Sequence, residues 1–203
     1  MDMERKKLIH THLLPLLGKI SVDQTEQITY ALSRHIRLRH AVSGEYLEEP
    51  GHAYEGQCLL LTQSLAHSFQ PVGGVENYRM IGTMIWPRRS LIFHPDALLD
   101  DHPITEYTQI LEAGPYLSIH YPVLRQLLGE LSLLRHGIHV LSRHQARQRM
   151  QHDQLLHLPP HLRVGHFERQ QSSFCKVATI SQRAMHVSLS RQSYTRNRKG
   201  PTI

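Results

Sequence analysis

The chain has 203 residues, and its 40% hydrophobic content excludes wholesale disorder and suffices for one large or two small domains. It contains no apolar run of about 18 residues, so we expect no membrane-spanning helix. The N-terminal stretch is broken by His10, His12 and Pro15, which argues against a signal peptide. Two distant cysteines, Cys58 and Cys175, argue against a disulfide framework and favour a reducing cytoplasm.

Charge is segregated along the chain. The formal net charge is +6, yet residues 169–203 contain no Asp or Glu. The cations of this segment are Arg169, Lys176, Arg183, Arg191, Arg196, Arg198 and Lys199. Clustered cations release counterions from a phosphate backbone, so the pattern predicts a polyanion-binding end, with a solvated basic tail as the alternative.

Histidine is unusually frequent, with 17 residues. Zinc sites need three or four converging ligands, commonly with cysteine or carboxylate support. The sequence has neither HExxH nor CxxC. We therefore predict no metal site and no cofactor, and expect a charge that varies with pH near neutrality.

Helical periodicity opens the chain. Residues 5–17 predict a short helix that ends at Gly18. A second helix is predicted to begin at Ser21, whose hydroxyl suits an N-cap, and Ile28 and Leu32 follow at helical spacing.

Short apolar runs separated by turn residues fill residues 40–120. Their spacing of about ten residues predicts an antiparallel sandwich or barrel. The predicted strands are Cys58–Leu61, Met80–Trp86, Leu91–Phe93, Thr108–Leu111 and Tyr116–Ile119, and the turns include Ser43-Gly44, Pro50-Gly51, Gly73-Gly74 and Gly114-Pro115.

Helical spacing returns from Pro122. Apolar residues recur at 3-4-3-4-3 intervals, which is the a/d seam of a coiled coil. These residues are Leu124, Leu127, Leu131, Leu134, Ile138 and Leu141. The seam predicts a dimerisation helix, but it covers fewer than three heptads, so a helix packed on its own domain is the alternative.

The basic C-terminal segment contains two apolar clusters, one around Phe174 and one around Ala184. Between them, Thr179–Ser181 suits a tight turn in which Ser181 caps the second helix. Two short helices across a tight turn in an acid-free segment are typical of a helix-turn-helix.

The order of these segments resembles the Crp/Fnr family of bacterial transcription regulators, in a divergent, Bacteroidetes-like form. The resemblance covers nearly the whole chain and is carried by residues 43–61, 93–113 and 146–164. It implies an α+β protein in three parts. These are a double-stranded β-helix (jelly roll) cyclic-nucleotide-binding-like domain over 1–121, a dimerisation helix and hinge over 122–150, and a winged helix-turn-helix-like domain over 151–203.

Residues 93–113 can be laid without gaps on the phosphate-binding cassette of cyclic-nucleotide domains. This implies a ligand pocket formed by His94, Ala97, Leu98, Ile104 and Thr105. The family uses a Gly-Glu pair and an Arg to hold ribose and phosphate, whereas this chain has His94, Pro95 and Ile104 there. A buried phosphate without a cation is costly, so we predict no cyclic AMP binding in the usual mode.

The family's helix-turn-helix pattern, IASYLGIT-x-x-[ST]LSRIRK, can be laid on residues 174–190. Its turn glycine is then Thr179 and its base-reading Ser-Arg pair is His186-Val187, whereas a Ser-Arg pair occurs only later, at Ser190-Arg191. The resulting DNA-binding candidates are Gln182, Arg183 and His186 for base reading, Arg191, Arg196, Arg198 and Lys199 for phosphate contacts, and also Lys176 and Ser181.

The predicted function is a homodimeric, cytoplasmic, DNA-binding transcription regulator. Its expected partners are duplex DNA and a second copy of the chain, with a small-molecule effector left open and no membrane. No GxSxG, P-loop or GxGxxG motif is present, so we expect no enzyme. The alternative is a non-enzymatic ligand- or protein-binding module, derived from a cyclic-nucleotide domain, without specific operator recognition.

Overall fold

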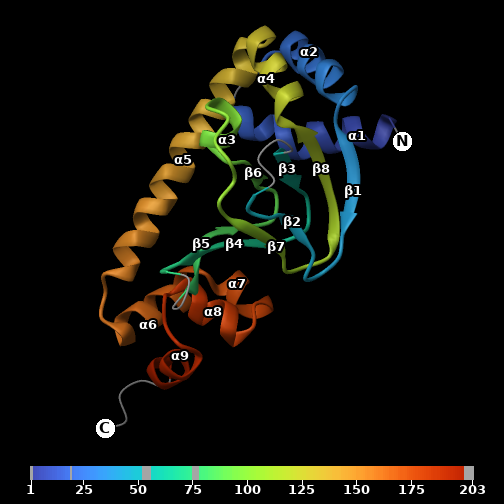
Figure 1. The fold of residues 1–203 in the computed structure, drawn as a ribbon. Coiled ribbons are helices and arrows are strands. Elements are labelled where there is room, and N and C mark those ends of the chain that lie inside the picture. Colours follow the sequence, from blue (N-terminus) through green and yellow to red (C-terminus); the bar gives the residue numbers. More distant parts are fainter. Residues whose placement is uncertain (1, 19, 52–55, 75–77, 199–203) are drawn as a thin grey trace.

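The computed structural model describes residues 2–18, 20–51, 56–74 and 78–198. Helices lie at both ends of the chain and the strands lie between them (Figure 1). The helices are α1 (Asp2–Leu8), η1 (Ile9–Leu13), η2 (Leu14–Leu17), α2 (Val22–Ser33), α3 (Pro95–Leu99), α4 (Tyr121–Glu130), α5 (Ser132–Leu156), α6 (Pro160–Gln170), α7 (Ser172–Val177), α8 (Ile180–His186) and α9 (Arg191–Arg198).

The strands form two four-stranded sheets with the orders β1-β8-β3-β6 and β2-β7-β4-β5. All of the pairings are antiparallel, as the short, regularly spaced runs predicted. The strands are β1 (Arg37–Ala41), β2 (Tyr46–Glu48), β3 (Gln57–Leu61), β4 (Ala66–Val72), β5 (Arg79–Trp86), β6 (Leu91–Ile92), β7 (Tyr107–Ile110) and β8 (Gly114–His120).

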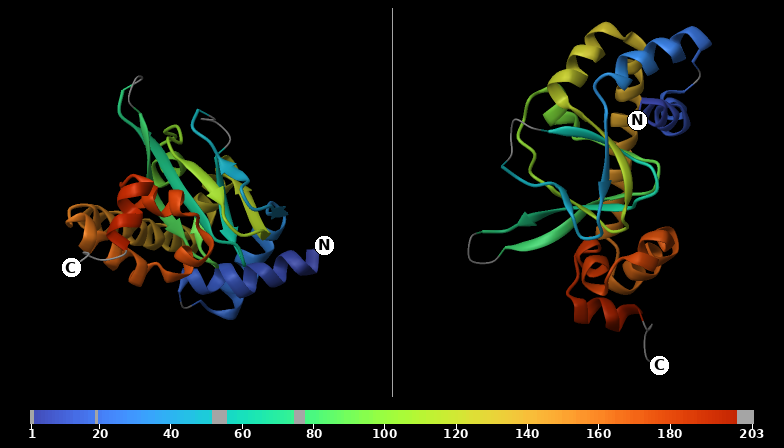
Figure 2. Two further views of the ribbon diagram at one scale, coloured as in Figure 1. Left: turned by 90° about the horizontal axis from the view of Figure 1, so that it is seen from below. Right: turned by 90° about the vertical axis from the view of Figure 1, so that its right-hand side faces the viewer.

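The two sheets face each other, and helices cover the outer face of each (Figure 2). The position of strand β3 explains its continuous apolar sequence. Leu59 and Leu61 point into the core between the sheets, while Cys58 and Leu60 point into the core under the N-terminal helices, α4 and α5. Because successive side chains of a strand point to opposite faces, a strand buried on both faces needs an unbroken apolar run.

The predicted N-terminal helices are present, with one difference in form. Ser21 caps α2 in a capping box, because its hydroxyl accepts from the Gln24 amide while the Gln24 side chain accepts from the Ser21 N–H. Residues 5–17 are not one α-helix. They pass from α1 through the π-helix η1 to the 3-10 helix η2, and Gly18 ends the run at a φ of 91°.

The helix predicted to begin at Pro122 is two helices. It breaks at Leu131, between α4 and the 25-residue α5. The predicted dimer seam is wrong as a surface for a second chain, because its side chains belong to the core of the same chain. Leu124, Leu127, Leu131, Leu134 and Ile138 are all buried, and Leu141 packs against them. The alternative, a helix packed on its own domain, is what the structure shows.

The sequence did not predict β1 and β4. Arg37, Arg39 and His40 make β1 look like loop, although it pairs with β8 along its whole length. The outer half of β4 contains Gln70 and Pro71, which are not typical of an apolar strand, so it was not predicted. Gly114-Pro115, expected as a turn, begins strand β8 instead.

The C-terminal helices α6 to α9 pack around one apolar cluster that includes Phe167, Phe174 and Tyr194. Leu65 and Ile85, from the loop before β4 and from β5, join this cluster, so the helices are seated on the second sheet. Residues 121–198, all of which the structure describes, contain helices and turns but no strand, so the wing stays a prediction.

Candidate nucleic-acid interface and ligand pocket

Helix α9 presents a basic surface at the end of the molecule farthest from the N-terminal helices (Figure 1). Tyr194 anchors the helix. Its ring is fully buried against Phe167, and its hydroxyl donates to Glu168 over 2.7 Å. Tyr194 is the one buried side chain of α9, so the other faces of the helix are open to a partner. Four residues line a shallow hollow there, namely Arg191, Gln192, Thr195 and Arg196.

A tight turn joins α8 to α9. Ser188 adopts the left-handed conformation, with a φ of 52°, and the Leu189 amide donates back to the Ala184 carbonyl over 2.9 Å. Ser190 then caps α9, because its hydroxyl accepts from the Ser193 amide over 3.1 Å. Two helices joined by such a turn, with the second exposed, have the local geometry of a helix-turn-helix.

The turn predicted at Thr179–Ser181 is therefore not the one that precedes the exposed helix. Thr179, not Ser181, caps α8, in a capping box with Gln182. Helix α8 faces the second sheet rather than solvent. Gln182 donates to Gln109 of β7 over 3.1 Å, and His186 is buried against β4 and β5.

The family pattern fits better nine residues later, without gaps, on residues 183–199. Its turn glycine then falls on Ser188, which alone among the described residues 183–198 has a positive φ, and its next threonine on the cap Ser190. Its buried leucine falls on Tyr194, and its Ser-Arg pair on Thr195-Arg196. Ser190-Arg191 resembled this pair in the sequence but lies at the start of the helix instead.

The predicted DNA-binding residues differ in the helix that carries them and in their exposure to solvent. Arg191 and Arg196 are exposed on α9, and Arg198 is on the same helix but pairs with Glu168 at 3.0 Å. Lys176 and Ser181 are exposed on other helices, and Arg183 is half-buried with its Nε–H donating to the Ala178 carbonyl. His186 is buried, so its predicted role in base reading is wrong. Lys199 lies outside the described residues. Gln192 and Thr195 were missed, because the pattern was laid one helix too early.

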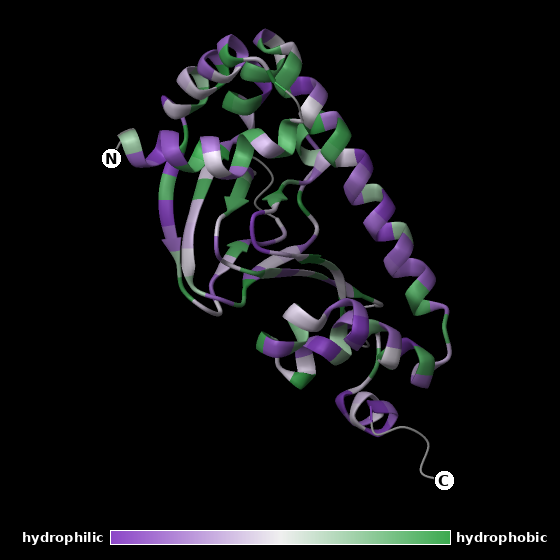
Figure 3. Cartoon of the chain, turned by 180° about the vertical axis from the view of Figure 1, so that it is seen from behind, coloured by the Kyte–Doolittle hydropathy of each residue, from purple (hydrophilic) through white to green (hydrophobic). Residues whose placement is uncertain are grey.

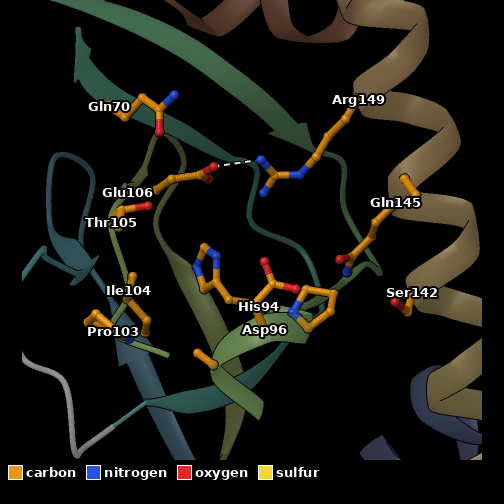
Figure 4. A pocket seen from close by; sticks show the side chains of 13 residues that line it. Gln70, His94, Asp96, Pro103, Ile104, Thr105, Glu106, Ser142, Gln145 and Arg149 are labelled. Atoms are coloured by element: carbon orange, nitrogen blue, oxygen red, sulfur yellow. Dashed lines mark hydrogen bonds and ion pairs between the residues drawn. The ribbon is translucent and has the colours of Figure 1, made fainter. Parts of the chain in front are cut away.

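A separate pocket of about 370 Å³ lies between the predicted cassette and α5 (Figure 4). The cassette side contributes His94, Pro95, Asp96, Ala97 and residues 103–106, and β4 contributes Gln70. Helix α5 closes the other side with Ser142, Gln145, Ala146 and Arg149.

Of the predicted pocket residues, His94, Ala97, Ile104 and Thr105 line the cavity. Leu98 does not, because it is fully buried in the core under the helices. The contributions of α5 and Gln70 were missed. Nothing in their spacing relates them to the cassette, and only the tertiary packing brings them to it.

Two pairs, each with a buried carboxylate, lie at this pocket, and the Arg149 side chain of one of them is 38% exposed. Glu106 accepts from the Arg149 guanidinium over 2.6 Å and from the Thr83 hydroxyl over 3.0 Å. Glu48, behind the cavity, lies 2.8 Å from His94 Nε2. Burial by itself would lower the pKa of His94, but the carboxylates of Glu48 and Glu106 raise its pKa above the ordinary value. The ring is therefore positioned to share a proton with Glu48.

No group of three or more His, Cys, Asp or Glu side chains that could hold a metal ion occurs among the described residues. Within the same residues, no helix is both long and apolar enough to cross a membrane.

The arrangement of two sheets, a long connecting helix and C-terminal helices is the fold of Crp/Fnr transcription regulators, as the resemblance predicted. One solved structure of this fold is a Crp/Fnr-family regulator from Eubacterium rectale. It has a TM-score of 0.71 and 13% identity, and the match covers 92% of this chain and 85% of that chain. A second is the c-di-GMP-responsive global regulator CLP of Xanthomonas campestris, with a TM-score of 0.69, 12% identity and coverage of 86% and 90%.

A kinase subunit shares only part of the fold. The regulatory subunit of a cAMP-independent protein kinase A from Trypanosoma cruzi, bound to guanosine, has a TM-score of 0.51 and 12% identity. The match covers 66% of this chain and 44% of that chain. The family models and the curated proteins contain no match to this sequence.

Proposed function

We propose that the protein is a DNA-binding transcription regulator of the Crp/Fnr type, acting in the cytoplasm as a homodimer. In this proposal residues 1–121 form a jelly-roll effector domain, residues 122–150 lie in the connecting helices, and residues 151–203 carry a winged helix-turn-helix. The observation that carries the proposal is α9. It is an exposed, cationic helix behind a left-handed turn, in a chain whose fold matches those of a Crp/Fnr-family regulator and of the global regulator CLP.

Helix α9 has the groups that DNA recognition requires. Arg196 can donate two hydrogen bonds to guanine in the major groove, and Gln192 can pair with adenine. Arg191 and the exposed Lys176 are suited to phosphate contacts, which position the protein without reading sequence. If α9 reads bases, the protein is a transcription regulator rather than a ligand- or protein-binding module without specific operator recognition.

A dimer in this proposal uses the outer ridge of α5, since the predicted seam is buried. Exposed residues follow that ridge at 4-3-4-3-4 spacing, from Ser132 through His136, His139, Arg143 and Ala146 to Met150. Figure 3 shows that most of α5 beyond its first turns is hydrophilic. A two-fold dimer would place two α9 helices for two half-sites of a palindrome.

The test is selection of duplex DNA from a random library by the full-length protein, followed by fluorescence anisotropy on the selected sequence. We expect a palindromic consensus. Arg196→Ala should weaken binding by about 1–3 kcal/mol and relax the preference at one base position of each half-site. Arg135→Ala, an exposed arginine on α5, is the matched control and should bind as the wild type does. An Arg196 variant that binds the selected DNA as tightly as the wild type does, with an unchanged base preference, would remove α9 from DNA recognition.

A further inference from the structure

Among the described residues that line the pocket between the cassette and α5, no Lys or Arg is free to pair with a phosphate. Arg149 is the one Lys or Arg among its lining residues, and its guanidinium already pairs with the buried Glu106 carboxylate. Ile104, also buried, occupies the position where the cassette pattern has its arginine. A phosphate entering this cavity would lose its hydration and gain no unpaired positive charge.

A cationic ligand gains little either. Both buried carboxylates near the cavity are already compensated, Glu106 by Arg149 and Glu48 by His94. The remaining acid among the described lining residues is Asp96, which is exposed to solvent. The paired charges of the interior therefore offset each other. Drawing Arg149 away to an anion would leave the buried Glu106 carboxylate uncompensated, and drawing Glu48 away to a cation would leave the buried His94 without its partner.

One buried hydrogen-bond acceptor of the lining has no donor. Gln145 is 5% exposed, and its side-chain oxygen has no hydrogen-bond partner, while its Nε2 donates to the Leu91 carbonyl over 3.5 Å. The side chain extends from α5 into the cavity toward the cassette (Figure 4). A buried polar atom left unpaired costs about 1–3 kcal/mol, which a ligand donor would recover.

Further polar groups line the cavity together with Gln145. The hydroxyls of Thr105 and Ser142 and the amide of Gln70 also line the cavity. Hydroxyls and amides match donors of a neutral molecule, and a volume of about 370 Å³ lies within the usual range of small-ligand sites. The described residues that line the pocket include no Phe, Tyr or Trp, and His94 is their one ring-bearing aromatic side chain.

We propose that this pocket binds an uncharged small molecule of nucleoside size, rich in hydroxyl and amino donors and lacking phosphate, with the Gln145 side-chain oxygen as a direct acceptor. The proposal deepens the regulator assignment by giving the chemical class of its effector. Because the cassette and α5 line the same cavity, such a ligand would join the β-domain to the helix that leads to the C-terminal helices.

The experiment is isothermal titration calorimetry of the full-length protein, without DNA, with adenosine, guanosine, cyclic AMP and spermidine as probes. We expect at least one nucleoside to bind with a Kd at least tenfold lower than those of cyclic AMP and spermidine. Gln145→Leu should raise that Kd at least tenfold. Gln154→Leu, an exposed glutamine on the same helix, should leave it unchanged. Thr105→Val provides a second pocket variant if Gln145→Leu does not fold, which circular dichroism would show.

Three outcomes would overturn the proposal. They are cyclic AMP or spermidine binding as tightly as either nucleoside, no heat with either nucleoside at millimolar concentration, and nucleoside binding that survives both pocket variants. These results leave DNA recognition untouched, because that is measured separately on Arg196. Failure of the ligand proposal and failure of the proposed function are therefore distinguishable.

Discussion

The imidazoles of His67 and His186 meet across the junction between the β-domain and the C-terminal helices, with His67 Nε2 3.2 Å from His186 Nδ1. His67 comes from β4 and His186 from the end of α8, and both rings are buried. His152 of α5 joins them, with its Nε2 2.8 Å from the His186 carbonyl oxygen. One hydrogen-bonded cluster therefore connects the sheet, the long helix and the helix-turn-helix.

We predict that acid loosens this junction. Burial lowers the pKa of His67 to about 3, and burial together with the neighbouring His67 and His152 lowers the pKa of His186 well below its ordinary value. These buried imidazoles stay neutral while the C-terminal helices are docked on the second sheet. When the helices separate from the sheet, the histidines become exposed and gain protons below about pH 6.5. Docking should be at full strength above pH 6.5 and should lose up to about 1.4 kcal/mol per histidine for each pH unit below it. Hydrogen exchange of β5 and α8 at pH 7.5 and pH 5.5 measures this.

A variant separates this cluster from the other histidines. His67→Phe keeps the ring but removes its titration, so the difference in exchange between the two pH values should shrink. His144→Gln, on the exposed face of α5, should leave that difference unchanged. His94 works in the opposite direction, because its raised pKa stabilises the fold below pH 6.5 and this contribution disappears as the pH rises through the folded pKa. A difference that persists in full in His67→Phe would contradict the role of the cluster.

Gly82 of β5 allows the two histidines to approach the sheet. A Cβ atom there would lie 2.6 Å from His67 Nε2 and 2.7 Å from the His186 Cα, which is backbone and cannot swing aside. We predict that Gly82→Ala destabilises the protein by about 1–3 kcal/mol in urea unfolding. Gly129→Ala is the matched control, because its Cβ would meet nothing within 4 Å and helix propensity would favour it by up to about 1 kcal/mol. Equal effects of the two alanines would mean that the close approach is not limiting.

Ser188 holds the turn between α8 and α9 in an unfavourable backbone conformation. The left-handed conformation that its φ of 52° requires costs about 1–2 kcal/mol for residues other than Gly, Asn and Asp. Ser188→Gly should therefore raise the free energy of unfolding by about 0.5–1 kcal/mol, and Ser188→Val should lower it. Ser173→Gly, at an exposed position inside α7, should lower it as well, since glycine weakens a helix. A loss of stability in Ser188→Gly would show that the serine is retained for its side chain.

The strands whose apolar runs are continuous or alternating could be predicted from the sequence, because burial on one or both faces dictates the pattern. Those with polar or proline-bearing outer positions, such as β1 and half of β4, could not. The register of the helix-turn-helix failed for a related reason. A glycine normally marks the left-handed turn, and Ser188 gives no such signal, so the pattern was placed on Thr179, whose φ is −65°.

Two features could not be predicted from local spacing because they depend on tertiary packing. The seam from Leu124 to Leu141 has the same period whether it faces a second chain or the chain's own core. The pocket likewise joins residues 94–106 to Ser142, Gln145 and Arg149, which lie about forty residues further along. The cassette side was therefore predictable from sequence, whereas the side formed by α5 was not.

The outer ridge of α5 leads to a last prediction, on the proposed homodimer. Met150 is 55% exposed and lies on the ridge, one helical turn beyond the exposed Ala146, so these are its apolar members. Arg143 lies on the same ridge, and across a two-fold axis it would face its own copy. Met150→Asp should raise the dimer Kd in sedimentation equilibrium, while Arg143→Gln should lower it and reduce its dependence on salt. Ile138→Ala, inside the buried seam, should cost about 2–5 kcal/mol of stability without changing the dimer Kd below the unfolding transition. If the dimer Kd changes with Ile138→Ala but not with Met150→Asp, the dimer interface lies at the apolar seam from Leu124 to Leu141 and not at the outer ridge.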